Sequence, residues 1–397
     1  MRLYTIALIF LLLTVVLPDL FFFLKLKKHK VNKWIQVLNL LPTVFFVGAF
    51  LTLKFSGRSF NDPDMLHTFM WINFAFMVIY IPKLVYVIFH FLNYLLNLML
   101  KEKIYLLRYA GALVAMFVVL LMAHGAMVNP MTVQLREVVL EVDELPEAFE
   151  GYRIVQISDT HLGSWGGNAR YLKPAIDQVN KLDADILVFT GDIVNNYAEE
   201  LDGWQEHFLQ MKAKEGKYAI MGNHDYGDYS DWKDDAAKEV NLLAIEQGLS
   251  DFGFHLLLNE KVDLIRDSSV IELLGVENWG KPPFPKYGNL SGTLEECDSS
   301  RLKILLSHDP SHWRAEVLEH EQIFLMLAGH THAAQIAFNM YGKLWSPSSW
   351  VYDEWDGLYE EGKQFLFINR GLGFTGIPVR IGAARPEVTL IILKKKA

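Results

Sequence analysis

Five clusters of Asp, Asn, His and Gly residues each follow a short β-rich run in the C-terminal two thirds of the chain. In α/β sheets, ligands bind beyond the carboxyl ends of the strands, so five such loops can converge on one spot. Residues i and i+2 of an extended segment point the same way, so an Asp-x-His or His-x-His pair can offer two ligands to one centre. The clusters are Asp159-Thr-His161, Gly191-Asp192, Gly222-Asn223-His224-Asp225, His308-Asp309 and Gly329-His330-Thr-His332.

The candidate ligands are carboxylates, imidazoles and one amide oxygen, without a thiolate. This mixture suits Mn²⁺, Fe, Zn²⁺ or Mg²⁺ rather than Cu(I) or an iron–sulfur cluster. Two Asp, one Asn and four His are too many for one four-ligand site, but they suit two sites that share a bridging carboxylate. Two metal ions about 3.5–4 Å apart can generate a hydroxide and hold a phosphoryl group for in-line attack. The candidates are Asp159, His161, Asp192, Asn223, His308, His330 and His332.

Each cluster by itself is a weak signal. A Gly-Asp pair at the end of a strand is usually a turn, and a lone histidine such as His308 is usually structural. The specificity lies in the complete series, in this order and with each cluster after a strand. The series resembles the calcineurin-like metallophosphoesterase superfamily, and the resemblance covers about residues 150–393.

This resemblance implies an α/β domain with two facing mixed β-sheets flanked by helices and a dinuclear site at the strand ends. The cofactors would be two divalent metal ions, with Mn²⁺ favoured over Fe, Zn²⁺ or Mg²⁺. His224 would act beside the leaving-group oxygen, as a general acid or as a stabiliser of developing charge. The implied metal ligands are Asp159, His161 and His332 for the first ion, Asn223, His308 and His330 for the second, and Asp192 as the bridge.

Two further segments, residues 149–163 and 369–373, resemble the bacterial membrane-anchored subgroup. Two positions depart from the wider superfamily. Its phosphoprotein phosphatases carry Gly-Asp-x-x-Asp-Arg, whereas Asn195 and Asn196 stand at the last two positions here. The carboxylate that would orient the catalytic histidine and the arginine that would bind phosphate are absent, which argues against a protein phosphatase.

Other groups would then contact the substrate phosphate. Arginine forks match phosphate oxygens well, so we expect Arg370 to bind the substrate, with Arg380 and Arg385 as alternatives. Asn195 is a second candidate substrate contact. Asp225 follows His224 directly and is a candidate to orient it.

Short β-rich runs alternate with polar or amphipathic stretches over residues 130–397, which predicts one α/β domain with its own core. A helix is expected over residues 171–182, between the first two runs. Cys297 has no partner, so a disulfide scaffold is excluded, and the net charge of −9 argues against a nucleic-acid-binding protein. The expected strands are residues 153–158, 186–190, 218–221, 270–276, 303–307, 323–328, 365–369 and 388–393.

Long apolar runs fill residues 1–128. About 20 apolar residues are needed to cross the hydrocarbon core of a bilayer. Pro82 and Lys83 are expected to break the third run, which makes residues 84–100 an interfacial helix; a fifth span there is the alternative. A cleaved signal peptide is disfavoured because no A-x-A-like site follows residue 24. The four expected spans are residues 3–24, 34–53, 65–82 and 106–128.

Lysine and arginine residues gather in the first and third loops between these spans, which should therefore face the cytoplasm. With four spans, the N-terminus and residues 130–397 then lie outside the cytoplasm, on the inner (plasma) membrane. A fifth span at residues 84–100 would place the C-terminal domain on the opposite side.

The combined interpretation is a membrane-tethered, metal-dependent phosphoester hydrolase whose partners are the lipid bilayer and a phosphoester substrate. The domain is similar to UDP-2,3-diacylglucosamine pyrophosphatases, which suggests a lipid-linked phosphodiester or pyrophosphate such as UDP-2,3-diacylglucosamine. That substrate is made in the cytoplasm, so the expected topology favours an extracytoplasmic phosphodiesterase with another substrate. A membrane sensor or scaffold with a decayed site is the non-enzyme alternative, and the seven retained ligands argue against it.

Overall fold

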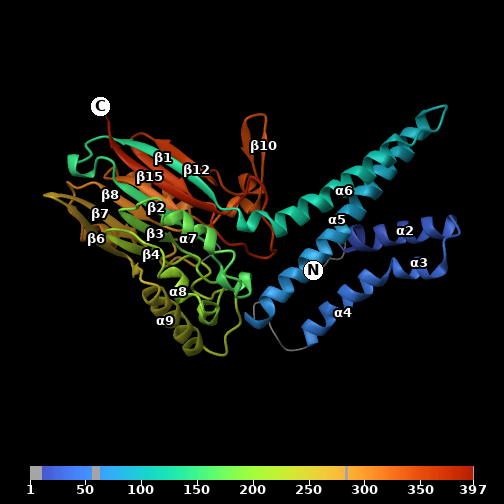
Figure 1. Cartoon of the computed structure of the whole chain (residues 1–397), viewed down its shortest axis with the longest axis horizontal. Coiled ribbons are helices and arrows are strands. Elements are labelled where there is room, and N and C mark those ends of the chain that lie inside the picture. The colour runs from blue at the N-terminus through green and yellow to red at the C-terminus, as the bar shows by residue number, and fades with distance from the viewer. Residues whose placement is uncertain (1–10, 56–62, 282–284, 397) are drawn as a thin grey trace. The chain divides into compact units, whose positions relative to one another are not determined.

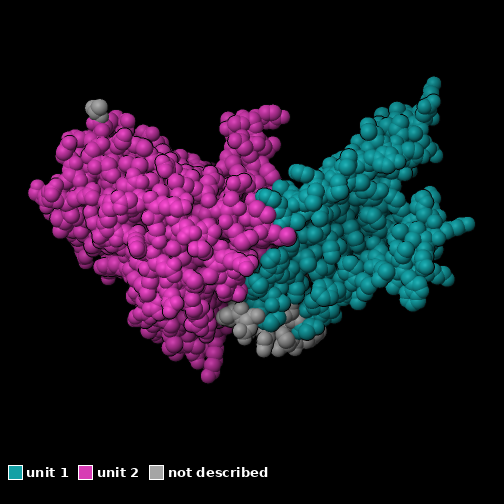
Figure 2. Space-filling view, in the orientation of Figure 1, with its two compact units in different colours: residues 1–124 teal, residues 125–397 magenta. Residues whose placement is uncertain are grey.

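The computed structural model describes residues 11–55, 63–281 and 285–396, and the chain forms two compact units, residues 1–124 and 125–397 (Figure 2). The division falls a few residues before the boundary at 128 that the sequence suggested. The helices of the first unit are a π-helical turn Leu12–Val16, α2 Leu17–Lys28, α3 Lys33–Leu38, α4 Leu41–Phe55, α5 Pro63–Met99 and α6 Leu106–Met127 (Figure 1). Helix α6 continues into the second unit.

Three helical segments among the described residues are long and apolar enough to cross a membrane: Lys33–Thr52, Met65–Met99 and Leu106–Met131. They correspond to the second, third and fourth expected spans. The first expected span, residues 3–24, begins outside the described residues, so only its second half is seen, within the π-helical turn and α2. The chain is therefore a membrane protein with a multi-helical N-terminal region.

The expected break at Pro82 is wrong, because α5 continues through Pro82 to Met99 and residues 84–99 are not a separate helix. Ending a helix inside an apolar region would expose several backbone polar groups, whereas an internal proline removes only one hydrogen-bond donor. Lys83 is accommodated because its ammonium lies 2.6 Å from the buried Asp19 carboxylate.

The second unit contains two six-stranded sheets. The order of the first is β1-β15-β2-β3-β4-β5, and that of the second is β12-β13-β9-β8-β7-β6. The first sheet consists of β1 Gln134–Val142, β15 Glu387–Lys395, β2 Arg153–Ile157, β3 Ile186–Thr190, β4 Gly216–Ile220 and β5 His255–Leu256. The second consists of β12 Gly357–Glu361, β13 Gln364–Ile368, β9 Ile323–Ala328, β8 Lys303–Leu306, β7 Ser269–Gly275 and β6 Glu260–Arg266.

The two sheets face each other across a common apolar core that both contribute to (Figure 1). Fully buried side chains such as Ile154 and Val188 of the first sheet share this core with Leu273 and Leu327 of the second. The α/β fold with two facing mixed sheets is thus confirmed, and each of the eight expected strands is present with small shifts at its ends. Strand β1 was not expected; it pairs in parallel with β15.

A third, small sheet has the order β11-β10-β14, with β11 Lys343–Trp345, β10 Ile336–Met340 and β14 Ile381–Gly382. The expected helix over residues 171–182 is shorter, and it packs against β15. The α-helices of this unit are α7 Lys173–Val179, α8 Gln205–Phe208, α9 Asp235–Asp251, α10 Leu290–Glu295 and α11 Ser311–Ala315. Short 3₁₀ helices are Asn129–Met131, Glu147–Phe149, Leu162–Trp165, Ala198–Leu201, Val317–Glu319, His332–Gln335 and Pro347–Trp350.

Strands β2, β3 and β4 are parallel neighbours in the first sheet, and β8 and β9 are parallel neighbours in the second. The carboxyl ends of parallel strands meet at one edge of a sheet. The loops after these five strands carry the five polar clusters, so the topology brings the clusters to a common edge of the unit.

Candidate metal centre

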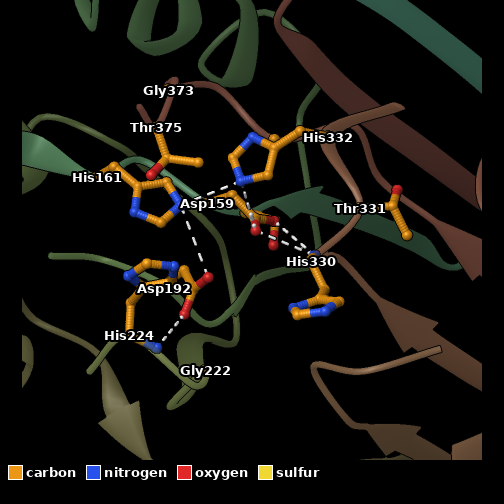
Figure 3. A network of polar contacts seen from close by, with 12 residues as sticks. Asp159, His161, Asp192, Gly222, His224, His330, Thr331, His332, Gly373 and Thr375 are labelled. Atoms are coloured by element: carbon orange, nitrogen blue, oxygen red, sulfur yellow. Dashed lines mark hydrogen bonds and ion pairs between the residues drawn. The ribbon is translucent and has the colours of Figure 1, made fainter. Parts of the chain in front are cut away.

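Four acidic and histidine side chains form the first ligand set: Asp159, His161, Asp192 and His332 (Figure 3). His332 Nε2 lies 3.2 Å from Asp159 Oδ1 and 3.0 Å from His161 Nε2. His161 Nε2 lies 3.6 Å from Asp192 Oδ2. All four residues are buried, so their donor atoms face one another rather than solvent.

The second ligand set is Asp192, Asn223, His308 and His330. His308 Nε2 lies 3.1 Å from Asp192 Oδ2 and 3.1 Å from Asn223 Oδ1. Asn223 Oδ1 also lies 2.8 Å from His330 Nδ1. The seven residues predicted from the sequence therefore converge, and Asp192 belongs to both sets.

Five of these ligands have left-handed backbone conformations: φ is 49° at Asp159, 44° at His161, 60° at Asp192, 72° at His330 and 50° at His332. Such conformations cost about 1–3 kcal/mol each in residues other than glycine, and they persist only where the surrounding structure enforces them. The loops thus hold their ligands at a cost in stability, a pattern typical of functional sites.

The glycines beside the ligands allow the loops to approach one another. A Cβ atom on Gly222 would collide with Asp192 Oδ1, and one on Gly329 would collide with Asp159 Oδ2. The Gly-Asn and Gly-His spacings therefore have a steric reason, because any side chain at the glycine would fill the space that the carboxylate needs.

The outer nitrogen of each histidine ligand has a partner that sets the orientation of the ring. His161 Nδ1 lies 3.1 Å from the Val194 carbonyl oxygen, and His308 Nδ1 lies 2.7 Å from that of Thr190. His330 turns its Nε2 to the hydroxyl of Tyr352, at 2.8 Å. Such outer contacts fix the ring and the tautomer of a histidine that binds a metal ion.

His332 and Asn223 also have outer partners. His332 is the exception among the histidines, because its Nδ1 faces a cation, with the guanidinium of Arg380 3.2 Å away. The Asn223 amide nitrogen donates to the Tyr229 hydroxyl over 2.7 Å, which leaves Oδ1 turned toward the ligands. Sequence reasoning missed Tyr229, Tyr352 and this role of Arg380. The sequence signals that mark those loops are the Asp-rich run of residues 228–235, which contains Tyr229, and the aromatic segment of residues 341–359, which contains Tyr352.

The protonation of the two sets differs. Burial lowers the pKa of His161 well below its usual value, so this ring is neutral near pH 7. Burial also acts to lower the pKa of His308, but the adjacent Asp192 carboxylate outweighs it and raises that pKa to about 10. For Asp192, burial acts to raise the pKa, and the neighbouring histidines His308 and His224 hold it well below its usual value.

His224 lies at the half-buried rim of the two sets. Its Nδ1 lies 2.9 Å from the backbone carbonyl oxygen of Asn195, and its backbone N–H donates to Asp192 Oδ1 over 2.9 Å. The imidazole packs against the rings of His161 and Tyr229. A carbonyl oxygen thus orients His224 where phosphoprotein phosphatases of the superfamily would use a carboxylate.

Asp225, considered as a partner of His224, has a different role. Its buried carboxylate accepts backbone hydrogen bonds from Asp192, Ile193, Val194 and Gly222. These bonds tie the loop after β3 to the loop after β4. Asp225 therefore positions the bridging ligand rather than the catalytic histidine.

The two candidate substrate contacts are both occupied by other partners. The Asn195 side chain donates to Glu200 and accepts from Ser164. Arg370 is 4% exposed and forms hydrogen bonds to both carboxylate oxygens of Asp356 and to the Ala383 carbonyl oxygen. This geometry favours structural roles over the phosphate contacts predicted from the sequence.

A pocket of about 230 Å³ adjoins the second ligand set through Tyr352, which lines it and contacts His330. Of its cations, Arg314 is paired with Glu354 and Glu361, whereas Lys281 is exposed. The lining residues are Trp279, Lys281, Ser311, Arg314, Ala315, Tyr352, Asp353 and Glu354.

The donor atoms fit divalent metal ions by their chemistry. Neutral imidazoles and carboxylates suit Mn²⁺, Fe, Zn²⁺ or Mg²⁺, and a carboxylate common to two sets suits a bridged pair of ions. Together with two mixed sheets that present these donors at the strand ends, this arrangement defines a metal-dependent phosphoesterase.

Comparison with protein families agrees with this class. Residues 152–334 match the calcineurin-like phosphoesterase family, and residues 1–130 match a family described as a probable calcineurin-like phosphoesterase, transmembrane domain. The chain belongs to the calcineurin-like phosphoesterase family and is a membrane-anchored metallophosphoesterase.

Three relatives illustrate the range of the family. The uncharacterized metallophosphoesterase YkuE of Bacillus subtilis is 32% identical over 281 residues, which cover 68% of this chain and 89% of that protein. A transmembrane protein with metallophosphoesterase domain from Danio rerio is 30% identical over 65% of this chain, and the match spans 57% of its own length. An uncharacterized metallophosphoesterase of Aquifex aeolicus is 26% identical over 71% of this chain and 99% of its own.

Proposed function

We propose that this metallophosphoesterase is a two-metal hydrolase and that the seven converging residues are its metal ligands. The observation that carries the proposal is Asp192, whose carboxylate belongs to both ligand sets and lies within reach of His161 and His308. Two bound divalent ions, proposed as Mn²⁺, would supply a nucleophile and neutralise the phosphoryl oxygens.

His224 is the proposed catalytic residue. Its Nδ1–H donates to the Asn195 carbonyl oxygen, so Nε2 is left for the substrate, and the imidazolium form can donate a proton from Nε2 to the leaving-group oxygen. Its place at the half-buried rim lets a substrate reach it, whereas Asp159, His161 and Asp192 are buried.

Lys281 is the proposed substrate-binding cation, since Arg370 is enclosed by Asp356. Lys281 lines the pocket beside Tyr352, so an anionic or polar group of the substrate beyond the scissile bond would lie there. A flexible ammonium can follow such a group without fixed geometry.

We further propose that the substrate is a lipid-linked phosphodiester or pyrophosphate and that the domain lies outside the cytoplasm. The continuity of α5 supports this side, because residues 84–99 add no separate span to the four expected ones. An extracytoplasmic site favours a substrate other than UDP-2,3-diacylglucosamine, which is made in the cytoplasm. The last candidate span ends at Met131, directly before β1, which supports action near lipid.

Hydrolysis of bis-p-nitrophenyl phosphate by the full chain in detergent tests the reaction. We expect turnover with Mn²⁺, none with EDTA and none in Asp192→Asn. A folded wild-type chain without turnover under any divalent metal ion would contradict the proposal.

A second experiment tests the lipid substrate. A diacyl phosphodiester in mixed micelles is compared with its deacylated, water-soluble analogue. We expect a higher kcat/KM for the diacyl form in the wild type, and equal values would contradict a lipid-linked substrate. A reporter fused to the C-terminus tests the side of the membrane.

A further inference from the structure

The end of the last candidate span forms part of the unit that holds the metal centre. This span runs over Leu106–Met131, and the second compact unit already begins at Gly125. Residues 125–131 are called the stem here. Two of its groups contact one residue of the C-terminal stretch. The Gly125 carbonyl oxygen accepts from the backbone N–H of Arg380 over 2.8 Å, and the Asn129 side-chain amide donates to the Arg380 carbonyl oxygen over 2.7 Å.

These contacts are enclosed and closely packed. Asn129 is 3% exposed and Arg380 is fully buried. A Cβ atom on Gly125 would lie 3.0 Å from the Arg380 carbonyl oxygen and 3.0 Å from Ile381 Cγ1, tighter than ordinary contact. The stem therefore fixes both backbone polar groups of Arg380 and leaves no room for the segment to shift toward it.

The Arg380 side chain reaches the first ligand set. Its guanidinium donates to the carbonyl oxygens of Gly373 and Arg370 over 2.8 Å each, and it lies 3.2 Å from His332 Nδ1. The Gly373 N–H in turn donates to the carbonyl oxygen of Asp159 over 2.8 Å. One buried residue thus connects the stem to His332 directly and to Asp159 through the loop at Gly373.

Charge adds a reason why this connection matters. A buried guanidinium is expensive unless it is hydrogen-bonded, and here the carbonyl oxygens of Gly373 and Arg370 accept from it, with His332 in contact beside them. Displacing the backbone of Arg380 would therefore force the whole guanidinium to rearrange, and the first ligand set with it.

We propose that Arg380 is a positioning residue through which the membrane stem holds the first ligand set in its metal-binding geometry. The inference rests on the proposed two-metal function. The stem is then part of the metal centre, and binding of one metal ion depends on the contacts between the stem and Arg380. Substitutions in the stem then affect the first ligand set and leave the second, which Arg380 does not contact, unchanged.

The test measures Mn²⁺ binding by the full chain in detergent, by calorimetry and by electron paramagnetic resonance. Asn129→Ala removes the bond to the Arg380 carbonyl oxygen, and Gly125→Ala crowds it. We expect each to weaken one of two Mn²⁺ binding events by about 10–100-fold, the range for groups that orient a metal ligand. The resonance of a coupled ion pair should give way to that of an isolated ion. Arg380→Lys should have the larger effect.

Thr132→Ala is the matched control, because the Thr132 hydroxyl bonds to Val128 at the stem and its side chain has no bond to Arg380. It should bind both ions as the wild type does. Two ions at wild-type affinity in Asn129→Ala and Gly125→Ala would overturn the inference, even if Arg380→Lys does not fold. Equal weakening of both ions would also overturn it, since that indicates a general loss of stability. A wild-type chain that binds no pair of ions would instead refute the proposed function.

Discussion

The two ligand sets use the same kinds of donor atoms but are held by different parts of the molecule. In the first set, buried ligands are oriented by the Val194 carbonyl oxygen and by Arg380. In the second set, tyrosine hydroxyls orient two ligands, the buried Asn223 through Tyr229 and the half-buried His330 through Tyr352.

The two sets are therefore not equivalent, although they share a bridging carboxylate. Backbone carbonyls and a buried guanidinium cannot move without the core, whereas Tyr229 and Tyr352 are side chains on loops, and Tyr352 also lines the pocket. Removing one outer contact should therefore affect one ion at a time, while removing Asp192 should affect both.

The largest effect is expected for Asp192→Asn, which removes the charge common to both sets. Binding of both ions should weaken, and turnover of bis-p-nitrophenyl phosphate should fall by roughly 10³-fold or more, as for other groups central to a catalytic unit. Asp183→Asn, an exposed carboxylate paired with Lys214, is the control and should keep full activity. A variant at position 192 that keeps two tightly bound ions would show that Asp192 is not the bridge.

His224→Gln should separate chemistry from metal binding. We expect both ions to remain bound while kcat falls by about 10²–10⁴-fold, the usual range for a general acid. Asn195→Ala should have a much smaller effect, because alanine retains the carbonyl oxygen that holds His224 Nδ1. If Asn195→Ala raises KM strongly with kcat unchanged, its side chain contacts the substrate, as the sequence suggested.

Tyr352→Phe and Tyr229→Phe test the two hydroxyl groups that contact ligands of the second set. Each removes a hydroxyl that orients a ligand of the second set, so the affinity for one ion should fall by about 10–100-fold while the other ion is retained. Tyr359→Phe is the control from the same aromatic segment, because its hydroxyl accepts from the Trp355 N–H and does not contact a ligand. Calorimetric titration with Mn²⁺ distinguishes these cases. Wild-type binding of both ions in Tyr352→Phe and in Tyr229→Phe would show that the two hydroxyls do not orient the second set.

The last prediction concerns pH, with an effect of about tenfold for each pH unit. With its pKa raised to about 10 beside Asp192, His308 carries a proton near neutrality that a metal ion must displace. Affinity at the second set should therefore rise by about tenfold per pH unit up to this pKa. His161 is already neutral, so the first set should respond less. Titrations between pH 6 and 9 that give equal slopes for both ions would contradict this.

The same pKa affects the stability of the metal-free protein. Because the folded-state pKa of His308 lies above the usual value of 6.5, its contribution is fully present below pH 6.5. It is lost as the pH rises through about 10. Thermal unfolding in EDTA across this range measures it.

In the membrane region, composition predicted apolar helices well but not their ends. Pro82 and Lys83 looked like a boundary because each is unfavourable in an apolar helix on its own. The structure continues α5 through both, since Asp19 on another helix neutralises Lys83. A contact between residues so far apart in sequence leaves no local signal.

In the candidate metal centre, residue type and spacing were enough to name the residues that converge. Hard and borderline donors placed directly after strands must meet at the edge of a sheet, so Asp159, Asp192 and the histidines could be named from the sequence. The glycines beside them were equally informative, since only glycine allows the close approach at Gly222 and Gly329.

The groups that orient those ligands were decided only by the tertiary structure. Arg370 and Arg380 are equally good phosphate-binding candidates by sequence. In the structure Arg370 is paired with Asp356, whereas Arg380 contacts His332. Tyr229 and Tyr352 lie in loops with no motif of their own. The sequence by itself therefore determined which atoms can bind metal, because donor type is a local property. Only the tertiary structure decided which groups orient them, because a hydrogen bond between distant segments depends on where folding places both of them.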